Sequence, residues 1–295
     1  MIVAGGLMPM LAWFGNAVMQ SVVPAGAAGG DAAQSGMTDA QPVTVSRDGH
    51  VAIVTFARPP LNFADLALIE AIGAGFAAAD ADPDVRAIVL QSEGRIFCAG
   101  ADLARDNPVA EDQPAGARNP FYVAAARLFA VNTPVVAAIQ GSAVGAGLGL
   151  ALVADFRIAA PEARFVANFV HLGFHPGFGI SAVLERVVGR QRSLLMNLTG
   201  RRIKAEQAAD WGLADSVVPA DQLRPAALAL AQEIAAGAPL AVQSTRATLR
   251  GDLFDLVQRQ TDHELAQQAW LQKTDDFAEG VRAVNERRPG RFTGR

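Results

Sequence analysis

Two stretches with very small side chains, each following an apolar run, most constrain how this chain can fold. FCAGADL (Phe97–Leu103) follows the run VRAIVLQS (85–92), and GSAVGAGLGL (Gly141–Leu150) follows PVVAAIQ (134–140). Backbone N–H groups where a strand passes into a helix have no intrahelical partner, and the helix dipole makes that place attractive to an anion. The two stretches therefore predict backbone sites for an anion or a developing oxyanion. Tight helix packing is the alternative explanation of the glycines.

Two better-known glycine motifs do not fit the second stretch. A dinucleotide fingerprint needs G-x-G-x-x-G/A, but the sixth position is Leu150 counted from Gly145 and Leu152 counted from Gly147. A nucleophile elbow needs G-x-S-x-G, whereas Ser142 stands in GSAVG. Neither nucleotide binding nor serine-based acyl transfer is indicated.

The pattern along the chain predicts an α/β fold with a helical C-terminal part. VTVSRDGHVAIVTFA (43–57) has the form of two strands joined at Asp48-Gly49, and 66–79 has the apolar spacing of a helix. The segment 102–120 is rich in Asp, Pro, Gly and Asn and predicts a loop. From Pro225 onward the sequence is nearly all helical in pattern.

The first 36 residues differ from the rest of the chain. They are apolar but are interrupted at Pro9, Gly15 and Pro24, and they contain no Lys or Arg. A membrane helix needs roughly 20 uninterrupted apolar residues, and a signal peptide starts with basic residues. We interpret this segment as a poorly ordered extension before Met37, with export as the alternative, because AGAAGG loosely resembles a cleavage site. The predicted division is 1–36 extension, 37–223 core domain and 224–295 helical region.

Composition excludes several classes of partner. The formal net charge of −4 offers no basic excess for a nucleic acid, and the broken apolar start does not predict a membrane protein. The single cysteine, Cys98, excludes an internal disulfide and a cysteine-based metal cluster. A reducing, cytoplasmic setting is expected.

Three segments together resemble the enoyl-CoA hydratase/isomerase (crotonase) superfamily. They are SEGRIFCAGADL, PVVAAIQGSAVGAGLGLALVADFRIA and LLMNLTGRRIKAEQAADWGLADSVV, and the resemblance runs from about Pro42 to the C-terminus. It implies a crotonase-like spiral of ββα units with a helical C-terminal trimerisation region, assembled as a homotrimer or hexamer. It also implies an acyl-CoA thioester as substrate and no separate cofactor, since coenzyme A is part of the substrate.

The resemblance also implies where the thioester is held. The two N–H donors of the family's oxyanion hole correspond to Ala101 and Ala146. Such donors stabilise the charge that develops on the thioester oxygen as an enolate forms. The other implied substrate-binding residues are Ala99, Asp102, Leu103 and Gly145, together with Arg287, Arg288 and Arg291 for the CoA phosphates. A tail that is merely solvated is the alternative for the three arginines.

The chain departs from the family where acids are expected. The two glutamates of the hydratases correspond to Gly149 and Phe169, and the acid of some isomerases, hydrolases and dehalogenases corresponds to Gly177. Glycine and phenylalanine carry no protons. Ordinary two-glutamate hydration is therefore not expected.

Other residues are candidates for proton transfer. His175 lies in a turn that borders the family's active site, and histidine exchanges protons near neutral pH. A structural role is the alternative for this residue. Further candidates are His171, Tyr122 and the loop residues Glu111 and Asp112, whereas Cys98 is expected to be a small buried residue rather than a nucleophile.

Two functional hypotheses follow. The first is an acyl-CoA enzyme, formally hydratase/isomerase-like, that acts as an isomerase, decarboxylase or thioester/C–C hydrolase. Decarboxylation is included because loss of CO2 generates the enolate without a protein base. The second is a non-catalytic acyl-CoA-binding protein that has kept the fold and lost the acids. Turnover of an acyl-CoA distinguishes the two.

Overall fold

A computed structural model describes residues 42–103, 107–110 and 118–295 of the chain. The predicted extension 1–36 and the loop candidates Glu111 and Asp112 lie outside the described residues. Contacts group residues 41–295 into one unit. The predicted boundary at residue 223 stays a prediction.

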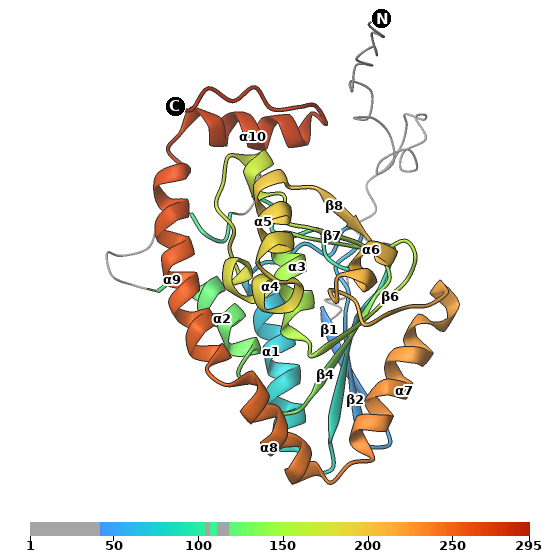
Figure 1. Cartoon of the computed structure of the whole chain (residues 1–295). Coiled ribbons are helices and arrows are strands. Elements are labelled where there is room, and N and C mark those ends of the chain that lie inside the picture. The colour runs from blue at the N-terminus through green and yellow to red at the C-terminus, as the bar shows by residue number, and fades with distance from the viewer. Residues whose placement is uncertain (1–41, 104–106, 111–117) are drawn as a thin grey trace, which may run out of the picture. The chain divides into compact units, whose positions relative to one another are not determined.

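The larger sheet is parallel except at one edge (Figure 1). β1 and β2 form an antiparallel hairpin that turns at Gly49, with φ of 55°, which confirms the hairpin predicted there. The following neighbours, from β2 to β9, pair in parallel. The strands in sheet order are β1 (Val43–Asp48), β2 (Val51–Phe56), β3 (Ala87–Ser92), β4 (Val135–Ile139), β6 (Phe156–Ala159) and β9 (Ser216–Val217).

A smaller second sheet supports the glycine-rich stretch. β5 (Ser142–Val144) pairs in parallel with β7 (Arg164–Val166), and β7 pairs antiparallel with β8 (Arg202–Lys204). We did not predict β5 or β8, because three residues are too few to establish an alternating pattern. Together the two sheets and their helices form the α/β architecture expected from the sequence.

Helices cover the larger sheet on both faces. α7 (Leu223–Ala235) packs on one face against a separate apolar cluster that includes Val89, Val136 and Ile158. The larger core lies on the opposite face, where α1 and α2 pack (Figure 1). The remaining helical segments are α1 (Leu66–Ala81), α2 (Pro120–Leu128), α3 (Ala146–Val153), η1 (Phe169–Leu172), α4 (Ile180–Val188), α5 (Arg190–Thr199), α6 (Ala205–Asp210), η2 (Ala220–Gln222), α8 (Pro239–Arg250), α9 (Leu253–Leu271) and α10 (Asp275–Asn285).

Side chains fix where several helices begin. Asp65, Asn119 and Thr274 each accept a hydrogen bond from a backbone N–H of the first turn, as N-cap residues do. Pro225 lies in the first turn of α7. N–H groups in the first turn of a helix make no intrahelical hydrogen bond, so the lack of an N–H in proline costs nothing there.

Within residues 42–103, 107–110 and 118–295, no single helix is long and apolar enough to span a bilayer. The helix pair Ala220–Ala235 and Pro239–Arg250 has the length and composition of a span, but it is bent by 105°.

Candidate active site

The two small-residue stretches lie against each other. The N–H of Cys98 donates to the carbonyl of Ser142 at 3.1 Å, and the N–H of Val144 donates to the carbonyl of Cys98 at 3.0 Å. These bonds form an isolated parallel bridge between Cys98 and Ala143. The FCAG turn is thereby held beside β5, directly before α3 begins.

This approach requires residues without a Cβ. A Cβ on Gly100, whose φ is 92°, would lie 2.7 Å from the carbonyl oxygen of Val144. A Cβ on Gly147 would lie 2.2 Å from the carbonyl oxygen of Cys98. Real Cβ atoms do not come so close to backbone oxygens, so glycine at both positions lets the two main chains meet.

Ala101 and Ala146 both line one cavity. Ala146 is the first residue of α3 and follows Gly145, which has φ of 53° and donates its own N–H to Val166 at 2.9 Å. Neither the Ala101 nor the Ala146 N–H donates to another residue in the described part of the chain. Two donors without acceptors, one of them at a helix N-terminus, suit an oxygen that carries negative charge.

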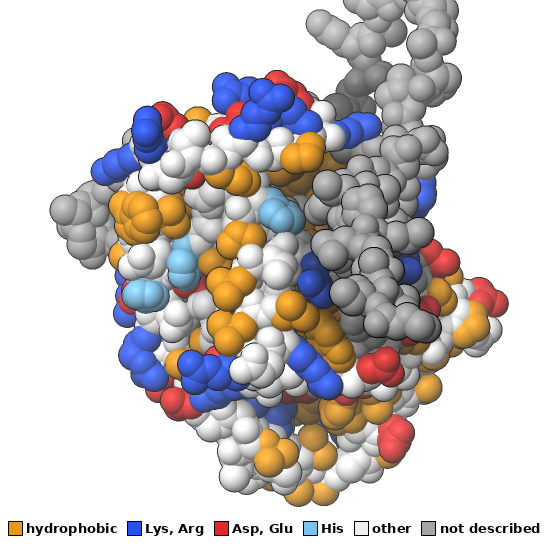
Figure 2. Space-filling view, turned by 45° about the horizontal axis from the view of Figure 1, so that its top comes forward, with side chains coloured by type: hydrophobic (Ala, Val, Ile, Leu, Met, Phe, Trp, Pro, Cys, Tyr) orange, Lys and Arg blue, Asp and Glu red, His pale blue; other side chains and the backbone are white. Residues whose placement is uncertain are grey.

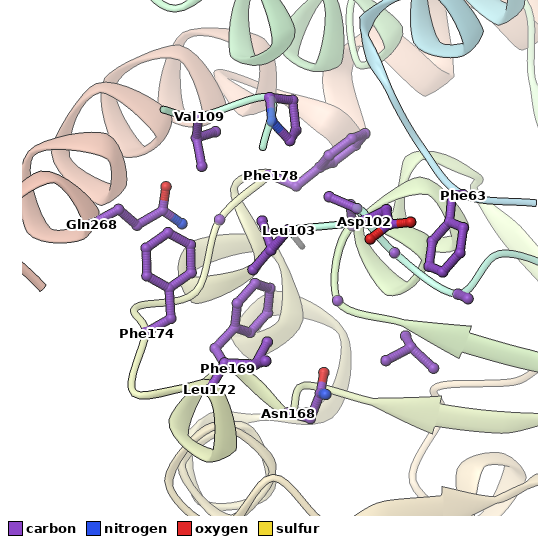
Figure 3. Close-up of a pocket in the computed structure, with 18 of the residues that line it drawn as sticks. Phe63, Asp102, Leu103, Val109, Asn168, Phe169, Leu172, Phe174, Phe178 and Gln268 are labelled. Carbon is purple, nitrogen blue, oxygen red and sulfur yellow. The ribbon is translucent and has the colours of Figure 1, made fainter. Parts of the chain in front are cut away.

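The cavity around these amides is mainly apolar. It encloses about 170 Å³, and Figure 3 shows aromatic and aliphatic side chains around it. Of the residues predicted to bind substrate, Ala99, Asp102, Leu103 and Gly145 line it. The aromatic lining consists of Phe63, Phe121, Tyr122, Phe169, Phe174 and Phe178.

Phe178 takes the space beside Gly149. A Cβ on Gly149 would lie 2.5 Å from Cδ1 of Phe178, so the ring leaves no room for a side chain there. Phe178 is 1% exposed and has φ of 63°, a conformation that L-residues rarely adopt. Because Phe169 also lines the cavity, phenyl rings lie at or beside both positions where the resemblance led us to look for glutamates.

Tyr122 takes the space beside Gly177. A Cβ on Gly177 would lie 2.1 Å from the Tyr122 hydroxyl oxygen. That hydroxyl donates to Oε1 of Gln268 at 2.7 Å, and Nε2 of Gln268 donates to the carbonyl of His175 at 2.9 Å. Burial, together with the nearby charge of Glu264, raises the pKa of Tyr122 well above its usual value, so the phenol stays protonated.

Glu264 on α9 holds the next part of this turn and was not found from the sequence. Its carboxylate is fully buried and accepts hydrogen bonds from the N–H of Gly179 at 2.7 Å and from the N–H and hydroxyl of Ser181. Burial raises its pKa from 4.5 to about 7, against the effect of these bonds. An acidic residue on an amphipathic helix carries no sequence signal that distinguishes it from a solvated one.

Neither of the two candidate histidines, His175 and His171, lines the cavity that contains Ala101 and Ala146. His175 is half-buried, donates from Nδ1 to the carbonyl of Pro176 at 2.8 Å, and lies edge-on to His263 with ring centroids 6.1 Å apart. Partial burial lowers its pKa. The ring of His171 packs against Gly200, and neither histidine is among the described residues that line the cavity. Cys98 is fully buried, which raises its pKa to about 12.

The predicted CoA-binding arginines lie at the C-terminal tail, outside the cavity lining. Arg288 pairs with Glu279 on α10 and with Glu286, and the main chain of Arg291 donates to Glu279 at 2.9 Å. Arg287 has φ of 57° at the start of this tail. None of the three arginines is among the described residues that line the cavity with Ala101 and Ala146, and their contact with CoA phosphates stays a prediction.

The part of the chain that the structure describes contains no group of three or more His, Cys, Asp or Glu side chains that could hold a metal ion.

The fold is that of an α/β protein with a parallel sheet, and Ala101 and Ala146 lie together at one cavity. Residues 46–295 match the family model described as enoyl-CoA hydratase/isomerase. The chain belongs to this family, whose members are enzymes that act on acyl-CoA thioesters.

Named relatives and solved structures agree with this assignment. The chain is 38% identical to the probable enoyl-CoA hydratase EchA14 of Mycobacterium tuberculosis, over 85% of this chain and all of that protein. It is 36% identical to the 2,3-dehydroadipyl-CoA hydratase of Escherichia coli, over 85% of this chain and 98% of that protein. The crystal structure of enoyl-CoA hydratase/isomerase from Pseudoalteromonas atlantica T6c superposes with a TM-score of 0.76 at 30% identity, over 85% of this chain and all of that one.

Proposed function

We propose that this protein binds an acyl-CoA thioester with its carbonyl oxygen between the N–H groups of Ala101 and Ala146 and stabilises the enolate formed from it. One observation carries the proposal: Ala101 and Ala146 line the same cavity, and the N–H of neither has an acceptor among the described residues. Hydrogen-bond donors that are already positioned where negative charge develops stabilise the transition state, and this effect makes a large contribution to the rates of acyl-transfer enzymes. Coenzyme A enters only as part of the substrate.

We further propose that the reaction is not a two-glutamate hydration. The space beside Gly149 is filled by Phe178, the space beside Gly177 by Tyr122, and Phe169 is itself apolar. Among the described lining residues, Asp102 is the one carboxylate, and it adjoins the amide of Ala101. A pair of carboxylates is needed to activate water in a two-glutamate hydration. A cavity with one described carboxylate instead favours reactions in which the two amides stabilise the enolate.

A substrate panel tests both proposals. The purified protein is assayed with crotonyl-CoA, a 3-enoyl-CoA and malonyl-CoA, with mass spectrometry identifying each product. We expect weak or absent hydration of crotonyl-CoA and turnover of another thioester. Rapid crotonyl-CoA hydration would contradict the second proposal and leave the first intact. Binding of acyl-CoA without any turnover would instead support the non-catalytic alternative.

A further inference from the structure

One end of the cavity carries no charged side chain among the residues described. Figure 3 shows Asp102 and Phe63 together at one side, with Phe174, Gln268 and Val109 at the other. Leu103 and Phe169 lie between these two groups in that view. A thioester held by the amides of the FCAG turn, next to Asp102, therefore has the Phe174 side available for its acyl group.

The polar groups at the Phe174 side are already engaged. The Tyr122 hydroxyl donates to Gln268, and the Gln268 amide donates to the carbonyls of His175 at 2.9 Å and Pro176 at 3.3 Å. No Lys, Arg or His occurs among the described lining residues. A carboxylate placed there would lose its hydration and gain no cationic partner from the described lining residues, which is strongly unfavourable.

We infer that the end of the acyl group held at the Phe174 side is uncharged and apolar, and that the cavity rejects acyl-CoAs whose acyl chain carries a carboxylate at that end. This inference rests on the proposed function, since it assumes that the thioester lies at the two amides. Aromatic rings attract quaternary ammonium groups, so a cationic acyl group is the competing possibility that the test must address.

Equilibrium binding of three thioesters tests the inference. Hexanoyl-CoA and adipyl-CoA have the same number of acyl carbons and differ in a terminal carboxylate, and a third probe carries a terminal trimethylammonium group. We expect hexanoyl-CoA to bind more tightly than adipyl-CoA by on the order of 100-fold. Equal or tighter binding of adipyl-CoA, or tightest binding of the cationic probe, would overturn the inference while the proposed function stands. If none of the three binds, the proposed function fails and the inference fails with it.

A charge introduced at Leu172 gives a second, independent readout. Leu172 is partly buried, lines the cavity, and lies beside Phe169 in Figure 3. Leu172→Arg supplies the missing cation and is expected to improve adipyl-CoA binding about tenfold or more while weakening hexanoyl-CoA binding. Leu172→Gln, which adds polarity without charge, is the matched control and should not improve adipyl-CoA binding. Equal improvement in both variants, each confirmed as folded by thermal melting, contradicts the inference.

Discussion

At Gly145 the backbone adopts a conformation that no other residue adopts readily. Its φ of 53° and ψ of −119° are the mirror image of an ordinary extended conformation, which glycine reaches at no steric cost because it lacks a Cβ. In this turn the Gly145 N–H bonds to Val166, whereas the N–H of the next residue, the cavity-lining Ala146, has no acceptor among the described residues. A proline disfavours the helical conformation in the residue before it and favours an extended one. Gly145, in the mirror image of an extended conformation, can therefore precede a proline at residue 146.

Ala146→Pro therefore removes one donor at small cost to folding. Proline is well tolerated as the first residue of a helix, and Ala146 opens α3. We expect turnover of the preferred acyl-CoA to fall on the order of 100- to 1000-fold, with melting temperature little changed. Ala146→Gly keeps the N–H and is the matched control. Full activity in a folded Ala146→Pro protein would remove Ala146 from the proposed oxyanion hole.

The contact between Gly149 and Phe178 is tested by stability rather than activity. Gly149→Ala should destabilise the protein by about 1–3 kcal/mol, because its Cβ would lie 2.5 Å from the ring. Gly73→Ala on α1 is the matched control, since its Cβ would lie 3.6 Å from Leu128 and a helical Gly→Ala change normally stabilises. Urea unfolding of both variants checks the prediction. Equal stabilisation by the two substitutions would show that Phe178 yields without cost.

At the scale of elements, α9 positions the turn that carries Phe178. Gln268 bonds to the turn before Phe178, and Glu264 bonds to the amides of Gly179 and Ser181 just after it. Glu264 thereby satisfies N–H groups at the start of α4, which lacks a side-chain cap of its own. One C-terminal helix thus fixes the conformation of a turn that lines the cavity.

The buried Glu264 makes stability depend on pH. Its pKa is about 7 in the folded protein and near 4.5 when unfolded, so between these values the folded state binds the extra proton. Stability then falls as pH rises through this window, by roughly 3 kcal/mol at 1.36 kcal/mol per unit, and is flat for this group above it. Glu264→Gln should remove that slope. Urea unfolding at several pH values checks this, and an unchanged slope in the variant would assign the effect elsewhere.

Elements with strong local patterns were predictable, and contacts between distant segments were not. The hairpin at Gly49, the apolar strand β4 and the helix α1 follow from turn chemistry and periodicity. Ala101 and Ala146 line the same cavity, but their role as donors stays a prediction from the resemblance, since main-chain donors depend on the course of the backbone rather than on side-chain identity. That Phe178 covers Gly149, or that Tyr122 meets Gln268, depends on three-dimensional packing that no local pattern contains.

At the scale of the whole described unit, the C-terminal tail secures one wall of the cavity. α10 contributes Val281, Val284 and Asn285 to the lining and packs closely on η1. The tail folds back on α10, with Glu279 accepting from Arg288 and from the Arg291 amide. Figure 2 shows basic and acidic side chains interleaved over this region. The arginines that we predicted to meet CoA phosphates include one, Arg288, whose side chain is engaged within the chain itself.

Loosening this tail should affect substrate binding more than chemistry. Hydrogen bonds from Arg288 and Arg282 hold the pKa of Glu279 well below its usual value, so its stabilising effect is present above about pH 4.5 and is lost as pH falls through the lowered pKa. Glu279→Gln is expected to raise KM with little change in kcat and to speed tryptic cleavage after Arg291.

Glu286→Gln is the matched control, because Glu286 is exposed and bonds to Arg288 alone among the described tail contacts. It should change both readouts less than Glu279→Gln does. Equal effects of the two substitutions would show that the tail is not held through Glu279.

The packing of Phe178 over Gly149 also has a consequence for the history of this sequence. A carboxylate at residue 149 would clash with the phenyl ring of Phe178, so this substitution is costly until that ring is replaced by something smaller. The effects of substitutions at the two positions are therefore coupled, and their order matters. A smaller residue at 178 makes room for a side chain at 149, whereas a side chain introduced first at 149 clashes with Phe178. Among related sequences, an acid at the position of Gly149 should accompany a small residue at the position of Phe178, and the pairing of glycine with phenylalanine should be inherited as a unit.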